Sequence, residues 1–319
     1  MIETPRLILD KGREKDWKSM FRNVWSRPES ARYMSWQVTE SEDQARDRMR
    51  RTIAFQKEHD TYLVYEKESG QAIGFAGVER VSPTVYEEAG ICLGPDYIRK
   101  GYGTEIVQGL IEYTRKTFGA LEFQYSSRDN NEASIRLAES LGFVNTGSRA
   151  CLDEKNGTLS TILIFRKKLV PYVRKALLSD AEAICRISSE EMGYPCDAGL
   201  VREKLKNLDP AREAVFVAMA GDASAGYIHV EKYDVLYFPS MANILGLAVS
   251  AASQHLGMGK ALLAAAEDWA RQQGIRQMRL NSGIDRTGAH AFYRHLGYID
   301  QKKQLRFIKQ LDVPEENHE

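Results

Sequence analysis

Short apolar runs bounded by turn residues alternate along this chain with longer segments in which apolar residues recur every three or four positions. The short runs predict β-strands, and the longer segments predict amphipathic helices. In the first half, strands are expected at 7–9, 61–66, 72–80, 88–93 and 121–126 and in a last pair ending at 162–165, with helices at 16–21, 41–56, after residue 103 and at 132–141. The second half restarts at residue 173, with strands expected at 215–219, 226–230, 244–249 and 278–281 and helices at 261–273 and 288–296. This order predicts an α/β (α+β mixed) fold class.

The same spacing of glycines occurs in both halves of the chain. A glycine that can end a helix follows Gly101 by 18 residues and Gly257 by 17, and a Leu-Gly-aromatic triplet follows them by 41 and 40 residues. A strand pattern ends eight residues before each of these glycines, at Leu93 and Val249. A repeat as long as a domain indicates a duplicated or fused domain, because solenoid repeats are much shorter.

The chain has 319 residues, which suits two domains of about 150 residues each. We therefore expect a first domain at 1–169, a second at 170–311 and a tail at 312–319.

The charge balance is even, with 44 basic and 44 acidic residues. Such a balance argues against nucleic acid or an anionic membrane as the main partner. The sequence has no apolar run that could span a bilayer and no secretory pattern at its start, so a cytoplasmic enzyme is expected. The four cysteines lack the spacing of a metal site, and no metal is expected.

Each glycine turn stands between a predicted strand and a predicted helix, as in an anion site. Such a turn aims backbone N–H groups at one point, and glycine lets a ligand approach the backbone closely. A Rossmann fingerprint would need a third glycine where Ile106 and Leu262 stand. A P-loop would need glycine in place of Gln254 and a hydroxyl residue in place of Ala261. Both of these phosphate loops are therefore excluded.

The turn at 254–259 has the pattern Gln-x-x-Gly-x-Gly. It resembles the pyrophosphate loop of the GNAT acetyltransferase superfamily, in which this turn holds coenzyme A. In the first half, Ile98 stands where this pattern begins with glutamine. Arg99 and Lys100 nevertheless place cationic side chains beside the turn. The alternative is that the glycines only close a tight strand–helix connection, which the double occurrence of the whole pattern disfavours.

The first half is also similar to the ribosomal-protein-alanine N-acetyltransferase-like branch of the superfamily. The similarity covers nearly all of 2–169, and the segments that carry it are 3–9, 32–36 and 131–136. In that branch the asparagine and serine of the last segment, here Asn131 and Ser134, contact coenzyme A.

The second half, 173–310, is similar to the general GNAT type through the segment 289–298. Arg286 stands where the family motif begins with asparagine. One coenzyme contact is therefore absent there or is replaced by a charge that can meet a phosphate.

The resemblance implies two tandem GNAT-type domains, each with a mixed, mostly antiparallel sheet flanked by helices. Each sheet is expected to split between its fourth and fifth strands, where the thioester of acetyl-CoA would lie. A bulge in the fourth strand, expected around Cys92-Leu93 and Ala248-Val249, would free backbone groups for the pantetheine arm and the oxyanion. The residues implied to bind coenzyme A are Cys92, Leu93, Arg99, Lys100, Gly101, Tyr102, Gly103, Thr104, Asn131, Ser134, Leu247, Ala248, Val249, Gln254, His255, Leu256, Gly257, Met258, Gly259, Lys260, Ala289 and Tyr293.

Acetyl transfer to an amine needs a neutral amine, a stabilised oxyanion and a proton for the leaving thiolate. Tyr293 stands four residues before Gly297, where the family has its general acid, and a phenol stays protonated at neutral pH. Packing beside Phe292 is the alternative role for Tyr293. The equivalent position in the first half is Ala138, so water would have to serve there.

Glu79 and Glu231 stand at corresponding positions and are the candidates for the general base, acting directly or through water. Most such glutamates are simply solvated. His229 is the next candidate, although a half-buried strand histidine is the more common situation.

Aromatic residues crowd the region where the family binds its acceptor: Trp17, Trp25, Tyr33, Met34 and Trp36. An aromatic wall would favour an amine with an apolar neighbour, and core packing explains these residues equally well.

The sequence thus predicts an acetyl-CoA-dependent N-acetyltransferase that acts directly on a primary amine of a small molecule or protein N-terminus. In one alternative only one half is catalytic and the other binds acyl-CoA or substrate. In another, the chain senses acyl-CoA without turnover. The fold does not choose the amine. Two similar halves form an internal pseudo-dimer, so a monomer or a homodimer is expected.

Overall fold

The computed structural model describes residues 1–153 and 157–311. The tail expected at 312–319 lies outside these described residues. The chain divides into two compact units, Met1–Arg279 and Leu280–Glu319. Its strands form two sheets flanked by helices, which confirms the mixed α/β fold class. Across the described ranges, no helix combines the length and apolar character needed to cross a membrane.

An eight-stranded sheet with the order β1-β2-β3-β4-β5-β6-β8-β7 forms in the first half. Its strands are β1 (Ile2–Glu3), β2 (Leu7–Asp10), β3 (Thr61–Glu66), β4 (Ala72–Ser82), β5 (Val85–Leu93), β6 (Glu122–Arg128), β7 (Val144–Asp153) and β8 (Thr158–Lys168). The β5–β6 pair is parallel, and the other six neighbouring pairs are antiparallel. The sheet is therefore mixed and mostly antiparallel, as expected.

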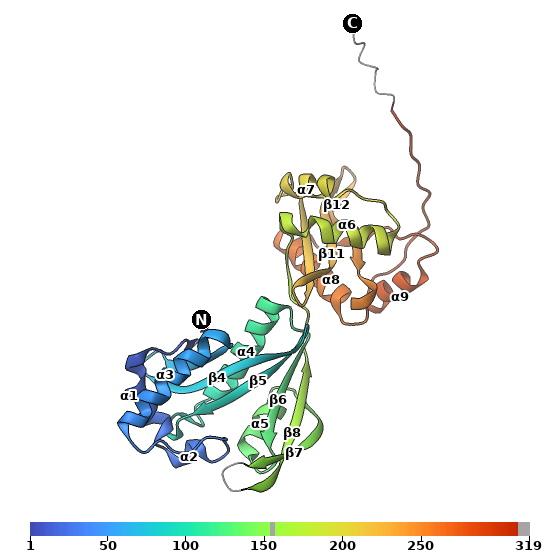
Figure 1. The fold of residues 1–319 in the computed structure, drawn as a ribbon. Helices are drawn as coiled ribbons and strands as arrows, with labels where there is room; N and C mark the ends of the chain where they lie inside the picture. Colours follow the sequence, from blue (N-terminus) through green and yellow to red (C-terminus); the bar gives the residue numbers. More distant parts are fainter. Residues whose placement is uncertain (154–156, 312–319) are drawn as a thin grey trace. The chain divides into compact units, whose positions relative to one another are not determined.

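Helices cover both faces of this sheet. They are α1 (Trp17–Met20), α2 (Pro28–Ala31), α3 (Glu42–Glu58), α4 (Tyr102–Phe118) and α5 (Glu132–Ser140) (Figure 1). Alternate residues of β3 enter different cores: Tyr62 and Val64 pack in the cluster that contains α4, and Leu63 packs with α1 and α3. This alternation follows from the period of two along a strand.

β5 and β6 pair over three residues only, from Val85 opposite Glu122 to Glu87 opposite Gln124. Both strands continue beyond this last pair, and Figure 1 shows them diverging. β5 and β6 are the fourth and fifth strands when the count starts at β2. The expected split is therefore present in the first half.

The β-bulge of β5 lies closer to this split than expected. Ala89 and Gly90 together face a single residue of β4. Gly90 has a φ of 87°, a left-handed value that glycine adopts readily and that many bulges need. Cys92 and Leu93 are regularly paired, so the expectation of a bulge there is wrong.

The second sheet has five strands in the order β13-β12-β11-β10-β9. Its strands are β9 (Val173–Lys175), β10 (Glu213–Ala220), β11 (Ala223–Val235), β12 (Phe238–Val249) and β13 (Met278–Leu280), and its helices are α6 (Ala181–Met192), α7 (Ala198–Lys206) and α8 (Met258–Gln272). β9 to β12 pair antiparallel in sequence order.

The bulge of β12 also lies nearer the middle of the strand than expected. His229 of β11 lies opposite Gly246, and the next residue, Val230, lies opposite Ile244. Leu245 is therefore the extra residue, while the predicted position at Ala248-Val249 is regularly paired. The two halves share this corrected position, since Ala89 and Leu245 both lie four residues before the end of their strands.

The unit that begins at Leu280 contains α9 (Thr287–His295). After α9 the chain turns back, and the Arg294 guanidinium donates two hydrogen bonds to the Asp300 carboxylate, at 3.1 and 3.0 Å. From 296 to 311, the last residues that the structure describes, no further strand forms.

Candidate functional site

The two glycine loops have the same backbone conformation. Arg99 and His255, at matched positions, have φ values of 60° and 61°, and in the described ranges no other non-glycine residue has a positive φ. Two residues later, Gly101 has φ 81° and ψ 2°, and Gly257 has φ 83° and ψ 1°. Left-handed backbone is unfavourable for arginine and histidine, so its occurrence at matched positions indicates a shared functional geometry.

Each loop leads directly into the first turn of a long helix. Gly101 is the N-cap residue of α4 and Gly257 is the N-cap residue of α8, and neither position has a side chain to cap the helix. The first N–H groups of a helix have no partner within it, and the helix dipole favours an anion there. Residues 99–101 and 255–257 are exposed. The backbone of each loop can therefore bind a phosphate or pyrophosphate.

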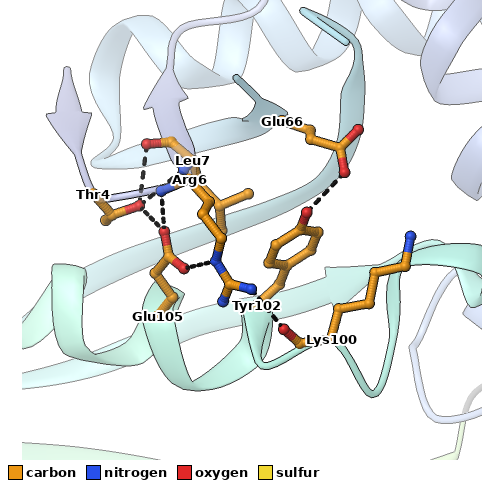
Figure 2. A network of polar contacts seen from close by, with 7 residues as sticks. All are labelled: Thr4, Arg6, Leu7, Glu66, Lys100, Tyr102 and Glu105. Carbon is orange, nitrogen blue, oxygen red and sulfur yellow. Dashed lines mark hydrogen bonds and ion pairs between the residues drawn. The ribbon is translucent and has the colours of Figure 1, made fainter. Parts of the chain in front are cut away.

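A polar network ties the first loop to the N-terminal strands (Figure 2). Oε1 of Glu105 accepts hydrogen bonds from the Thr4 hydroxyl at 2.6 Å and the Arg6 N–H at 2.7 Å, and Oε2 accepts from Arg6 Nε at 2.8 Å. Arg6 Nη1 donates to the backbone oxygen of Lys100 at 2.9 Å. Arg6 therefore connects a carboxylate in the first turn of α4 to the backbone of the loop.

The loop is also fixed through Tyr102, whose hydroxyl donates to Glu66 Oε1 at 2.8 Å while the Arg6 guanidinium lies 4.6 Å from the ring centre. Burial raises the pKa of Glu105, but hydrogen bonds from Thr4 and Arg6 and the charge of Arg6 outweigh it and hold this pKa below its ordinary value. This network was not predicted from the sequence, although the segment 3–9 carries part of the family resemblance.

The second loop lacks an equivalent of this network, because Ala261 stands where Glu105 stands in α4. Gln254 instead donates from Nε2 to Glu191 Oε2 and to the backbone oxygen of Val249, both at 3.3 Å. The N–H of Ala251 donates to Glu191 Oε1 at 2.6 Å. A carboxylate of α6 therefore holds the start of the second loop.

The predicted coenzyme residues of the loops differ in exposure. Tyr102 and Met258 are buried in the core, so only their backbone can face a ligand. The Lys100 ammonium lies 5.1 Å from the Tyr97 ring and remains exposed. The other predicted loop residues are exposed or half-buried: Arg99, Gly101, Gly103, Thr104, Gln254, His255, Leu256, Gly257, Gly259 and Lys260.

The predicted strand residues offer backbone groups at the ends of β5 and β12. Cys92 is buried, and its thiol donates to the backbone oxygen of Ser30 at 3.6 Å. Burial raises the pKa of Cys92 to about 12, so the thiol stays neutral and serves packing. Leu93, Leu247 and Val249 are half-buried, and Ala248 is buried.

Asn131 and Ser134 lie at the start of α5. Asn131 is its N-cap residue, and Oδ1 accepts the Ser134 N–H at 3.3 Å. The hydroxyls of Ser134 and Tyr125 are 2.8 Å apart, and burial raises the pKa of Tyr125 to about 12. This pair places two hydroxyl groups, both protonated at neutral pH, at the junction of α5 and β6.

An unpredicted carboxylate occupies the opening between β5 and β6. Glu88 Oε1 accepts hydrogen bonds from the Ser126 hydroxyl at 3.0 Å and the Ser126 N–H at 3.4 Å, and Oε2 accepts the Gly90 N–H at 2.7 Å. Burial raises the pKa of Glu88 to about 7, although these hydrogen bonds oppose the rise. A carboxyl group with this pKa exchanges protons near neutral pH.

The two glutamates predicted as general bases lie on β4 and β11, the strands that pair with the bulged strands β5 and β12. Glu79 is exposed and lies within β4, opposite Glu87. Glu231 lies within β11, and its Oε1 accepts a hydrogen bond from Asn243 Nδ2 at 2.9 Å. His229 Nε2 lies 2.8 Å from Glu213 Oε2. The signal for Glu88 was present in the sequence as an acidic pair inside a strand that leads to a glycine loop.

Tyr293 and Ala289 lie on α9. The Tyr293 ring packs against Phe292 and Tyr298, with ring centres 5.3 and 5.8 Å apart. Burial raises the pKa of the Tyr293 phenol, which keeps it protonated. Ala138, its counterpart in the first half, is buried in the core.

Family models match both halves of the chain. Residues 6–144 match the model described as "Acetyltransferase (GNAT) domain", and residues 181–298 match the model described as "Acetyltransferase (GNAT) family". Together the two matches include both glycine loops.

Individual proteins of this family are similar to parts of the chain. The aminoglycoside N(6')-acetyltransferase type 1 of Stenotrophomonas maltophilia is 30% identical over 148 residues, covering 44% of this chain and 95% of that protein. The uncharacterized N-acetyltransferase p20 of Bacillus licheniformis is 27% identical over 167 residues, covering 51% of this chain and 93% of that protein. A crystal structure of a GNAT-family acetyltransferase from Bacillus anthracis aligns with a TM-score of 0.46 and 20% identity, covering 52% of this chain and 97% of that one.

Each family match covers one half of the chain, and each half contains one sheet and one glycine loop. The chain therefore belongs to the GNAT family of acetyltransferases and carries two such domains in tandem.

Proposed function

We propose that this enzyme transfers an acetyl group from acetyl-CoA directly to a primary amine of a small molecule or protein N-terminus, and that the first half performs most of this transfer. The observation that carries the proposal is the carboxylate of Glu88, which lies in the split of a sheet whose glycine loop can hold a pyrophosphate. Membership of an acetyltransferase family supports acetyl-CoA as the donor.

The loops supply the binding groups for the coenzyme. Backbone N–H groups at the starts of α4 and α8 would hold the pyrophosphate, with Arg99 and Lys100 adding positive charge in the first half. The backbone of residues 91–93 would bind the pantetheine arm, which would bring the thioester into the split beside Glu88.

In the transfer, the amine nitrogen attacks the carbonyl carbon of the thioester. The new C–N bond forms, the C–S bond breaks, and the amine proton passes to the Glu88 carboxylate. The thiolate leaves and takes a proton from water, since a thiol with a pKa of about 8.5 needs little help. The products are an N-acetyl amide and free coenzyme A, and no acyl-enzyme forms.

The second half lacks a carboxylate at the corresponding place, because Ile244 stands where Glu88 stands. We propose that this half binds acetyl-CoA and transfers the acetyl group slowly, with Tyr293 as the acid and Glu231 as the remaining candidate base. The half-buried phenol of Tyr293, which burial keeps protonated, supports this proposal. The alternative is that the second half only binds the coenzyme.

The direct test mixes the full chain with acetyl-CoA and a panel of primary amines and follows release of free thiol. We expect release with a subset of amines, and at least about a hundredfold less with Glu88→Gln. Absence of release with every amine, or equal rates for the variant, would contradict the proposal.

A further inference from the structure

A pocket of about 620 Å³ opens in the first half between α3 and the strands β3, β4 and β5. Ala89, the bulge residue that follows Glu88, is part of its wall. The pocket therefore adjoins the part of the split where Glu88 lies. Its size suits a small molecule or the end of a peptide.

The charged residues in the wall of this pocket are all positive. Two arginines of α3, Arg48 and Arg51, contribute to it, and the described lining contains no aspartate or glutamate. A simple amine, which is cationic before it loses its proton, would be repelled by such a wall. A ligand with an anionic group would be attracted.

Arg48 lacks the carboxylate partner that a half-buried guanidinium usually has. Its guanidinium lies 4.8 Å from the Trp25 ring centre and 4.3 Å from the Trp36 ring centre, and Nη1 donates to the Thr39 hydroxyl at 3.0 Å. No ion pair to Arg48 occurs in the described residues. Burial lowers the pKa of Arg48 to about 10, and the nearby Arg51 contributes to this shift. Such a cation is costly to keep unless a ligand uses it.

Two further polar atoms of the lining residues lack partners. Nε1 of Trp36 and Oγ1 of Thr61 are buried and have no hydrogen-bond partner in the described structure. Buried polar groups are nearly always hydrogen-bonded in folded proteins. Both atoms belong to residues that line this pocket, so its wall contains unpartnered polar groups beside an arginine without a carboxylate.

We propose that this pocket binds the amine acceptor through an anionic group, carboxylate or phosphate, which pairs with Arg48. The inference rests on the proposed function, because it names the class of acceptor for the same site. The acceptor is then a small amine that carries a negative charge, held with its apolar part against the half-buried Trp36.

The binding test uses the full chain without acetyl-CoA and measures quenching of tryptophan fluorescence. The probes are the free protein amino acids, each compared with its amide, and O-phosphoethanolamine compared with ethanolamine. We expect at least one anionic probe to bind about tenfold or more tightly than its neutral counterpart. Amino acids that bind would identify a carboxylate, and O-phosphoethanolamine would identify a phosphate. Equal affinities within every pair would overturn the proposal.

The matched variants are Arg48→Met and Arg50→Met. Arg50 lies on the same helix, is exposed and pairs with Asp47 at 3.0 Å, outside the pocket. Arg48→Met should abolish the preference for the anionic probe, and Arg50→Met should leave it unchanged. Arg48→Gln is a second neutral variant in case Arg48→Met does not fold, and Arg48→Lys should restore part of the preference. A preference that survives in both neutral variants would refute the role of Arg48.

Thiol release separates this inference from the proposed function. If Arg48-dependent binding occurs but no probe or other amine releases thiol from acetyl-CoA, the proposed function fails and the anion site stands. If neutral and anionic amines are acetylated equally well, the proposed function stands and the inference fails.

Discussion

The Glu88 carboxylate accepts a hydrogen bond of 3.0 Å from the Ser126 hydroxyl, across the opening where β5 and β6 part. The last paired residues of the two strands are Glu87 and Gln124, so this contact lies just beyond the ladder. This half-buried carboxyl group at the head of the split is partly shielded from water. Its environment therefore suits proton exchange with a bound amine.

The first prediction concerns the pH dependence of turnover. Burial raises the pKa of Glu88 to about 7, and a general base must be ionised. We expect kcat/KM to rise with pH through an inflection near 7 and to level off above it. Glu88→Gln should remove this inflection and lower the plateau by a factor of about 10² to 10⁴. Initial rates of thiol release between pH 5.5 and 9 measure both effects.

Glu79→Gln is the control for that profile. Glu79 is an exposed glutamate on the neighbouring strand, so its loss should change the rate less than about twofold. A large effect of Glu79→Gln with an unchanged profile in Glu88→Gln would transfer the role of base to Glu79.

The second prediction concerns stability. A carboxyl group whose pKa is raised on folding contributes stability that is fully present below its ordinary pKa of 4.5 and is lost as pH rises through about 7. The free energy of unfolding should therefore fall by up to about 3 kcal/mol between pH 4.5 and 8 in the wild type, relative to Glu88→Gln. Urea unfolding of both proteins at several pH values measures the difference. If the free energy of unfolding changes with pH equally in both proteins, the pKa of Glu88 is not raised on folding.

The third prediction tests the network behind the first loop. Glu105→Gln removes the charge that Arg6 meets at 2.8 Å and should cost about 1 to 3 kcal/mol of stability at pH 7. The pKa of Glu105 is lowered from its ordinary value of 4.5 in the folded protein, so this loss should shrink as pH falls below that value and disappear once Glu105 is protonated in the folded state. Affinity for acetyl-CoA at the first loop should fall as well, because Arg6 binds the backbone of Lys100.

Lys67→Met provides the matched control for the network. Lys67 pairs with Glu3 at 2.7 Å, and that pair is more exposed than the Arg6–Glu105 pair. An exposed ion pair contributes about 0 to 1 kcal/mol, so coenzyme affinity and stability should change little. Equal losses of stability and coenzyme affinity in Lys67→Met and Glu105→Gln would show that Glu105 has no special role.

The fourth prediction separates the two halves. The activity that remains in Glu88→Gln should fall at least about tenfold when Tyr293→Phe is added. Tyr293→Phe alone should leave wild-type turnover within about twofold, because the first half dominates. Rates of thiol release from the four proteins give the answer. No further loss in the double variant would mean that the second half binds without turnover.

Local features of this fold were predictable from the sequence. The strand at 61–66 forms at the predicted residues, and both glycine turns form where expected. Strand patterns and glycine positions depend on neighbouring residues, which the sequence displays directly. The sequence also predicted the mixed sheet and its split, because these accompany the family resemblance.

Features that depend on pairing between distant residues were not predictable. The bulges at Ala89 and Leu245 follow from the register of one strand against another, which the sequence does not display. In the sequence Glu88 is an ordinary acidic residue of a strand, and only the folded sheet places Ser126 of β6 beside it. In the sequence Arg48 has the same character as the exposed Arg50 on the same helix. Only the folded structure packs two tryptophans against Arg48.

Titration calorimetry with acetyl-CoA determines whether both glycine loops, which share one backbone conformation, bind the coenzyme. The full chain should bind about two molecules. Gly101→Val and Gly257→Val should each remove one site, because valine does not tolerate the left-handed backbone of these positions. Absence of binding by the wild-type chain, or unchanged stoichiometry in both variants, would show that these loops do not bind the coenzyme.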